Sequence, residues 1–162
     1  MSASPAESRL DLVSEVQAIL ESETPRGELL RNFLRFASAL TAKDLSAIDD
    51  VVTPDSRFHD LEVVGYPRGP EGIKKFRREV NAAFPDQRAT ITAVRFEGDD
   101  IIEVDLDSTA THKGEFMGVP ASGRRVRFMI HTRDRFVGGK LAERWDRVDI
   151  EDIMRQLTGP AR

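Results

Sequence analysis

Apolar residues recur at helical spacing in the first half of the chain and at alternate positions in the second half. In the helical part, residues 29–40 carry a wide apolar stripe, which predicts one well-buried helix. A short helix is predicted over residues 44–52, stopped by Pro54, and a longer one over residues 73–84, ended by Pro85. The segment between these two helices, up to residue 64, is predicted to be extended.

The first 25 residues stand apart from this body. The spacing of Leu10, Val13, Val16 and Leu20 predicts one short helix that ends before Pro25. We therefore divide the chain into an N-terminal extension, residues 1–25, and one domain, residues 26–162.

After Pro85 the period changes from helix to strand. Predicted strands span residues 89–96, 102–112, 126–136 and 141–148. Glycine-containing turns separate the first strand from the second and the third from the last, and a short amphipathic helix over residues 150–157 follows. Helices that precede a run of strands predict an α+β domain with a curved, mostly antiparallel sheet.

The last predicted strand does not alternate cleanly between apolar and polar residues. One face carries Leu141, Glu143, Trp145 and Arg147, and the other carries Ala142, Arg144, Asp146 and Val148. A strand packed on a simple core keeps one face apolar. The mixture predicts that one face lines a partly polar cavity and the other meets a partner subunit. The alternative is an edge strand with solvated charges.

Composition narrows the class of protein. The 162 residues suit one domain, with 40% hydrophobic and 32% charged residues, as in ordinary soluble proteins. The net charge of −4 argues against a nucleic-acid partner, and no cysteine is present for disulfides or thiolate chemistry. No secretory signal and no apolar run of membrane-spanning length is evident. We expect a cytoplasmic protein without a membrane partner.

The chain shows no pattern typical of metal or phosphate binding. The three histidines, His59, His112 and His131, lack close ligand spacing. The glycine-containing segment over residues 65–72 includes two prolines, which lack the N–H groups that a phosphate loop needs. We therefore expect neither a metal nor a cofactor.

Four motifs occur in the order typical of a known family. They are PDSRFHD at 54–60, GPEGIKKF at 69–76, TATHKGEFMGVPASGRRV at 109–126 and GKLAERWD at 139–146. Together they resemble the SnoaL-like polyketide cyclase (ester cyclase) family, over about residues 29–157.

The resemblance implies a cone-shaped α+β barrel of the nuclear-transport-factor-two-like superfamily, with helices closing one mouth over a pocket. Family members with known chemistry cyclise polyketide esters by intramolecular aldol condensation without metal or cofactor, and their acid/base aspartate aligns with Asp146; many other relatives have no assigned activity. The superfamily also holds isomerases, epoxide hydrolases and binding domains, so the fold alone does not define the reaction. Arg144 departs from the family, which often has histidine there. A neighbouring guanidinium lowers a carboxyl pKa, so Arg144 weakens Asp146 as a base or serves to bind an anionic or enolate oxygen.

These considerations give two candidate catalytic residues, Asp146 and His59. His59 either contacts a substrate carbonyl or relays a proton, or is a half-buried structural histidine. The candidate pocket residues are Arg144, Thr132, Asp134, Trp145, Phe116, Phe33 and Phe58. Asp134 is either a pocket residue or the partner of an arginine on a neighbouring strand, and the apolar residues are either pocket wall or plain core.

Two functions remain open from the sequence. The first is a cofactor-independent enzyme that acts on an apolar carbonyl compound by acid/base catalysis, of the polyketide cyclase/aldol or isomerase type. The second is a non-catalytic small-molecule-binding or dimerisation module with the same fold. We also expect a homodimer, because Met129, His131 and Trp145 lie among charges on the outer face of the late strands.

Overall fold

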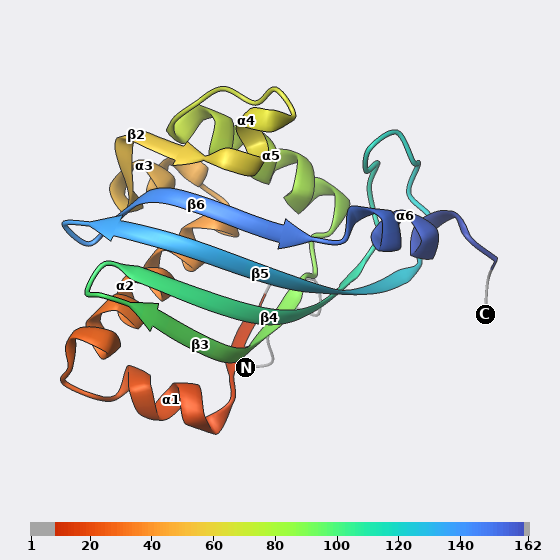
Figure 1. The fold of residues 1–162 in the computed structure, drawn as a ribbon. Helices are drawn as coiled ribbons and strands as arrows, with labels where there is room; N and C mark the ends of the chain where they lie inside the picture. The colour runs from red at the N-terminus through yellow and green to blue at the C-terminus, as the bar shows by residue number, and fades with distance from the viewer. Residues whose placement is uncertain (1–8, 161–162) are drawn as a thin grey trace.

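In the computed structural model, which describes residues 9–160, helices cover one side of a six-stranded sheet (Figure 1). The strands are β1 (Arg9–Leu12), β2 (Val52–Phe58), β3 (Arg88–Glu97), β4 (Ile101–Thr111), β5 (Arg125–Val137) and β6 (Lys140–Val148). They are ordered β1-β3-β4-β5-β6-β2, with antiparallel pairing from β3 to β6 and parallel pairing at both edges. The predicted α+β fold is confirmed, and the curved sheet stays open between β1 and β2.

The helices share the apolar core about equally with the strands. They are α1 (Ser14–Leu20), α2 (Pro25–Leu40), the 3-10 helix η1 (Leu45–Ala47), α3 (Ile48–Val51), α4 (His59–Val63), α5 (Pro70–Ala83) and α6 (Ile150–Thr158). Helix α2 starts with the side chain of Thr24 accepting a hydrogen bond from the N–H of Gly27. Its apolar stripe is buried against the sheet, and Phe33 and Phe36 are among the least exposed side chains of the core. The predicted central helix is therefore confirmed.

Two segments differ from the sequence prediction. The N-terminal helix begins only at Ser14, because residues 9–12 pair with β3 as strand β1. Leu10 and Leu12 both pack against the core, and their spacing fits a strand as well as a helix. The segment predicted to be extended up to residue 64 is extended only to Phe58, and helix α4 begins at His59.

Two β-bulges change which residues face the helices. In β6, Ala142 is the extra residue, so buried Leu141 lies on the same side of the sheet as Arg144. In β3 an extra residue, Thr92, has the same effect, and Val94 and Phe96 join the core beside Ile91. The sequence prediction assigned Leu141 to the face of Trp145, and the same alternation applied to residues 89–96 separates Val94 from Ile91. Both assignments are wrong, because strict alternation of faces takes no account of an extra residue at a β-bulge.

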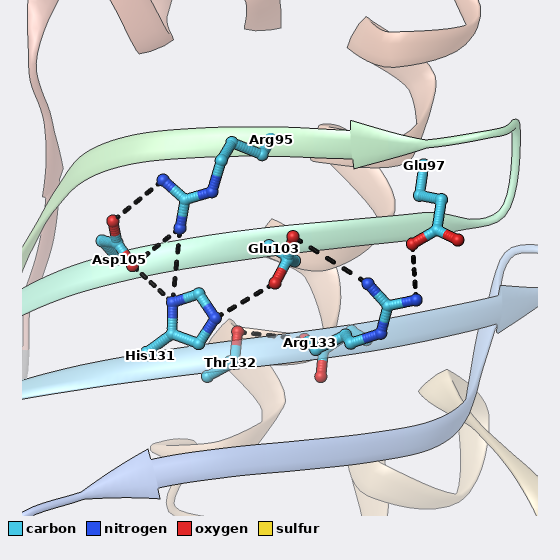
Figure 2. A network of polar contacts seen from close by, with 8 residues as sticks. Arg95, Glu97, Glu103, Asp105, His131, Thr132 and Arg133 are labelled. Atoms are coloured by element: carbon cyan, nitrogen blue, oxygen red, sulfur yellow. Dashed lines mark hydrogen bonds and ion pairs between the residues drawn. The ribbon is translucent and has the colours of Figure 1, made fainter.

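The outer side of the sheet carries a network of charged side chains (Figure 2). Arg95 on β3 forms an ion pair with Asp105 on β4, and His131 on β5 contacts Asp105 at 2.6 Å and Glu103 at 3.2 Å. Arg133 continues the network towards the end of β3. These contacts place His131 away from the helix-covered core. Among the helices of residues 9–160, none is both long and apolar enough to cross a membrane.

Candidate active site

A buried ion pair lies on the helix-covered side of the sheet. Arg144 on β6 and Asp134 on β5 are direct partners in the strand register. The guanidinium donates two hydrogen bonds, from Nε to Oδ1 and from Nη2 to Oδ2 of Asp134, each of 2.8 Å. Asp134 is fully buried and Arg144 nearly so. Of the two roles considered for Asp134, the structure shows a partner for an arginine on the neighbouring strand.

Aromatic rings hold this guanidinium in place. Its central carbon, Cζ, lies 4.7 Å from the ring centroid of Phe36, 5.5 Å from that of Phe58 and 5.9 Å from that of Phe33. A cation over aromatic rings is attracted by the ring quadrupoles, more strongly where water is excluded. Phe33 and Phe58 therefore form the apolar surroundings of Arg144, together with Phe36.

Asp146 follows Arg144 on the same side of β6 and lies opposite Thr132 of β5. Its Oδ1 is 3.5 Å from Nε of Arg144, and its backbone N–H donates to the carboxylate of Asp60. Oδ1 is buried and has no hydrogen-bond partner among residues 9–160, although 29% of the side chain remains exposed. A carboxylate that is both desolvated and reachable suits contact with a ligand.

The surroundings of Asp146 hold its proton more tightly than water would. Burial raises the pKa of Asp146 to about 6, against the opposing effect of Arg144, and the charges of Asp134 and Asp60 act in the same direction as burial. Arg144 lowers this pKa, as expected from the sequence, but burial outweighs its effect and the net shift is upward. The guanidinium makes its two hydrogen bonds to Asp134 and not to Asp146. Asp146 thus approaches the range in which a carboxyl group exchanges protons near neutral pH.

Arg77 on α5 joins this group of charges and was missed from the sequence. Its Nε donates to the carbonyl of Leu40 at 3.1 Å, and its Nη2 to Oδ1 of Asn81 at 2.8 Å. Burial lowers the pKa of Arg77 to about 10; the charge of Arg144 adds to this effect and that of Asp146 opposes it. The sequence did hold a signal, since Arg77 stands one helical turn after buried Ile73.

Five polar residues therefore gather on the helix-covered side of β5 and β6. This interior polar cluster consists of Arg77, Thr132, Asp134, Arg144 and Asp146. Thr132 is buried, and its hydroxyl lies 3.5 Å from Asp134 Oδ2. Arg144 is held in its charged form because neighbouring carboxylates outweigh burial and raise its pKa.

His59 and Trp145 lie on the opposite side of β6. The Nε2 atom of His59 is 2.8 Å from Glu143, and its ring stacks on Trp145 with centroids 4.7 Å apart. Glu143 also pairs with Arg135 at 2.8 Å. A surface depression of about 340 Å³ lies on this side, lined by Thr53, Asp55, Arg57, Arg135, Val137, Ala142 and Glu143. The structure does not bring His59 to Asp146, because helix α4 starts at His59 and directs its ring to the outward residues of β6.

Phe116 belongs to a second apolar cluster, in the loop between β4 and β5. Its ring centroid is 5.0 Å from that of Phe84, and the cluster lies under α6. Fully buried His112 anchors this loop, with Nδ1 accepting a hydrogen bond from the backbone N–H of Ser122. Phe116 therefore does not border Arg144. Within residues 9–160, no set of three or more histidine, aspartate or glutamate side chains is arranged to hold a metal ion.

Comparison with known proteins assigns the family. The sequence profile of the SnoaL-like polyketide cyclase matches residues 31–157, and the chain therefore belongs to this family. A search of curated proteins gave no match.

Solved structures agree with the assignment. TsrD from Streptomyces laurentii superposes with a TM-score of 0.73 at 25% identity, over 85% of this chain and 100% of TsrD. Wild-type IdmH from Streptomyces antibioticus gives 0.66 at 26% identity, over 80% and 97% of the two chains. A SnoaL-like polyketide cyclase from Agrobacterium tumefaciens gives 0.65 at 25% identity, also over 80% and 97%. The fold is thus of the nuclear-transport-factor-two-like type.

The buried ion pair is expected to matter more to stability than an exposed one. Replacing Arg144 by Met leaves the buried Asp134 carboxylate without its counter-charge, and we expect a loss of about 3–5 kcal/mol in the free energy of unfolding. The double variant Arg144→Met/Asp134→Leu should regain most of this loss, because neither charge remains. Urea denaturation measures both quantities.

Arg127→Met provides the matched control for that measurement. Arg127 pairs with Asp107 at 2.6 Å, but 71% of its side chain is exposed. We expect a change below about 1 kcal/mol. Equal losses for the buried and the exposed variant, or a double variant as unstable as the single one, would contradict the assigned role of the pair.

The raised pKa of Asp146 predicts a pH dependence of stability. Between the ordinary value of 3.8 and about 6, the folded protein retains a proton that the unfolded chain has released. The wild type should therefore lose stability relative to Asp146→Asn as the pH rises through this window, by up to about 3 kcal/mol. Urea unfolding of both proteins at a series of pH values measures the difference, in which other titrating groups largely cancel. If the wild type instead gained stability relative to Asp146→Asn as the pH rose, the pKa of Asp146 would be lowered in the folded protein. The charge of Arg144 would then outweigh burial.

Proposed function

We propose that this protein is a small-molecule enzyme of the polyketide cyclase type, in which Asp146 moves a proton to and from a carbon next to a carbonyl group. The observation that carries the proposal is the buried Oδ1 of Asp146, which has no hydrogen bond among the described residues and belongs to a side chain that still has exposed surface. Family membership supports the substrate class, since the matching profile is that of a polyketide cyclase.

The proposed reaction begins with proton abstraction. Asp146 takes a proton from the carbon next to the substrate carbonyl, and the electron pair of the C–H bond passes into an enolate. In an aldol cyclisation, the enolate carbon attacks a second carbonyl of the same molecule. The resulting alkoxide then receives the proton back from Asp146. In an isomerisation, the proton would return to a different carbon. A carboxyl pKa near 6 suits both halves of this cycle, because the group must accept and release a proton.

The surroundings of Asp146 suit an apolar carbonyl compound. Phe33, Phe36 and Phe58 surround the neighbouring guanidinium and exclude water from that side. Water exclusion strengthens the electrostatic interactions that stabilise an enolate. The sequence of steps neither oxidises nor reduces the substrate, so we propose that the enzyme works without a cofactor.

The alternative is a binding module that retains the fold without turnover. The replacement of the usual family histidine by Arg144 favoured this alternative from the sequence. In the structure, Arg144 directs two hydrogen bonds to Asp134, whereas Asp146 Oδ1 has no hydrogen bond among the described residues. This difference favours the enzyme.

Substitution of Asp146 tests the enzyme directly. With aryl-substituted β-keto esters as probes, we expect the protein to accelerate exchange of the α-proton in D2O above the buffer rate. Asp146→Asn should lower the enzymatic rate by about 10²–10⁴-fold, because an amide cannot take the proton. The rate should rise with pH as a group with a pKa of about 6 deprotonates. Proton NMR follows the exchange, and mass spectrometry detects any cyclised product.

His59→Gln is the control for this assay. His59 contacts Glu143 and Trp145 on the other side of β6, so we expect an unchanged exchange rate. Probe binding without exchange above the buffer rate would favour the binding module. An equal loss of exchange rate in Asp146→Asn and His59→Gln would mean that Asp146 is not the base of the reaction.

We further propose that the protein is a homodimer formed through the outer side of the sheet. Met129, Val137 and Trp145 are exposed there among paired charges. Such a face buries apolar surface and keeps the ion pairs at its rim.

Sedimentation velocity tests the dimer. We expect a dimer for the wild type and a shift towards monomer for Met129→Glu, which adds a charge where apolar contact is needed. Met117→Glu is the matched control, because Met117 is exposed in the loop between β4 and β5 and not on the sheet. A monomer over a wide concentration range would contradict the proposal.

A further inference from the structure

Arg77 is a partly buried cation held only by neutral groups. Its contacts among the described residues are the carbonyl of Leu40 and the side-chain oxygen of Asn81. It forms no ion pair with any carboxylate of residues 9–160. By contrast, nearby Arg144 has the carboxylate of Asp134 as a bidentate partner. A guanidinium that is partly removed from water, still accessible and without a counter-charge in contact favours an anion beside it.

Both arginines of the interior polar cluster retain an unused amino group. Arg77 donates through Nε and Nη2, and so does Arg144. The Nη1 groups of both residues make no hydrogen bond within the part of the chain that the structure describes. Asp146 Oδ1 also has no hydrogen-bond partner among the described residues, although it lies 3.5 Å from Nε of Arg144. Unassigned donors and an unassigned acceptor thus occur together, as expected where a ligand is to be bound.

The charges of the cluster also favour an anion. Arg77 and Arg144 are balanced by Asp134 and by the ionised form of Asp146, whereas Asp60 lies at the exposed edge. When Asp146 holds its proton, one positive charge is left over. A ligand with one negative charge restores neutrality in that state.

We propose that Arg77, assisted by Arg144, binds a carboxylate of the substrate, so that the natural substrate is an acidic carbonyl compound. The carbonyl part of this statement rests on the proposed function, and the carboxylate part rests on Arg77. The anion would contact the Nη1 groups, and the carbon acid would lie towards Asp146. The aromatic rings around Arg144 accommodate the apolar part of such a molecule.

A pair of probes that differ only in charge tests the inference. We would measure the affinity of the protein for 4-acetylbenzoate and for 4-acetylbenzamide by isothermal titration calorimetry. Both are aryl ketones of similar shape, and only the first carries a carboxylate. We expect the acid to bind the wild type about ten- to a hundredfold more tightly than the amide, as is usual for a charge-assisted hydrogen bond to a guanidinium.

Variants of α5 assign this preference to a residue. Arg77→Gln should remove the preference for the acid, and Arg77→Lys should retain part of it, since Lys keeps the charge but not the planar donors. Arg78→Gln is the matched control, because Arg78 is the next residue of the same helix and is exposed. It should behave as the wild type. Circular dichroism confirms that each variant is folded.

The outcomes separate this inference from the proposed function. Equal affinity for acid and amide, no binding of either probe, or a preference that survives in Arg77→Gln would overturn the inference. If neutral β-keto esters still exchange their protons in an Asp146-dependent way, the enzyme would stand, with Arg77 facing only the enolate oxygen. Conversely, Asp146→Asn should keep the preference for the acid, because its binding does not require turnover. A preference for the acid in a protein without any exchange activity would overturn the function alone.

Discussion

The bidentate contact between Arg144 and Asp134 is the interaction on which the site depends. The strand register places the two residues opposite each other, and three aromatic rings surround the guanidinium. Two charges at this depth tolerate burial because each satisfies the other. The pair therefore fixes the ends of both side chains on the helix-covered side of the sheet, and the neighbouring groups are arranged around it.

The pair also determines the chemistry of Asp146. A free guanidinium 3.5 Å from a carboxylate would stabilise the charged form and keep its pKa low. Because the hydrogen bonds of Arg144 run to Asp134, and because Asp134 is itself negative, burial prevails and the pKa of Asp146 rises to about 6. An arginine beside an acid/base residue is thus compatible with catalysis when a second carboxylate engages the arginine. The ordinary interpretation of an Arg–Asp neighbour in sequence, a weak base, fails here for this reason.

The sequence predicted the layout of helices and strands well, since the periods of 3.6 and 2 are direct consequences of element geometry. It also named Asp146, Arg144, Asp134 and Thr132 as candidate site residues, and the structure brings them together because they are paired across two adjacent strands. It failed where geometry is not periodic. The bulge at Ala142 moved Leu141, and the start of α4 turned His59 outward. Arg77 was missed because the search of that helix followed apolar residues, although a basic residue on the buried face was the informative exception.

The cost of this arrangement is itself an argument about its purpose. A well-packed apolar core at the position of the ion pair would be at least as stable, so stability alone does not explain two arginines and two aspartates on the buried side of the sheet. Ion pairing explains Arg144 and Asp134, which satisfy each other. It does not explain Arg77, whose contacts are neutral. It also does not explain why Asp146 Oδ1, at 3.5 Å from Arg144, has no hydrogen bond among the described residues. These two side chains have opposite charge, act on each other's pKa, and retain unused donor and acceptor atoms. A ligand with a carboxylate and a C–H group next to a carbonyl can contact both side chains, the carboxylate at Arg77 and the C–H group at Asp146. For this reason we place anion binding and proton transfer in one site.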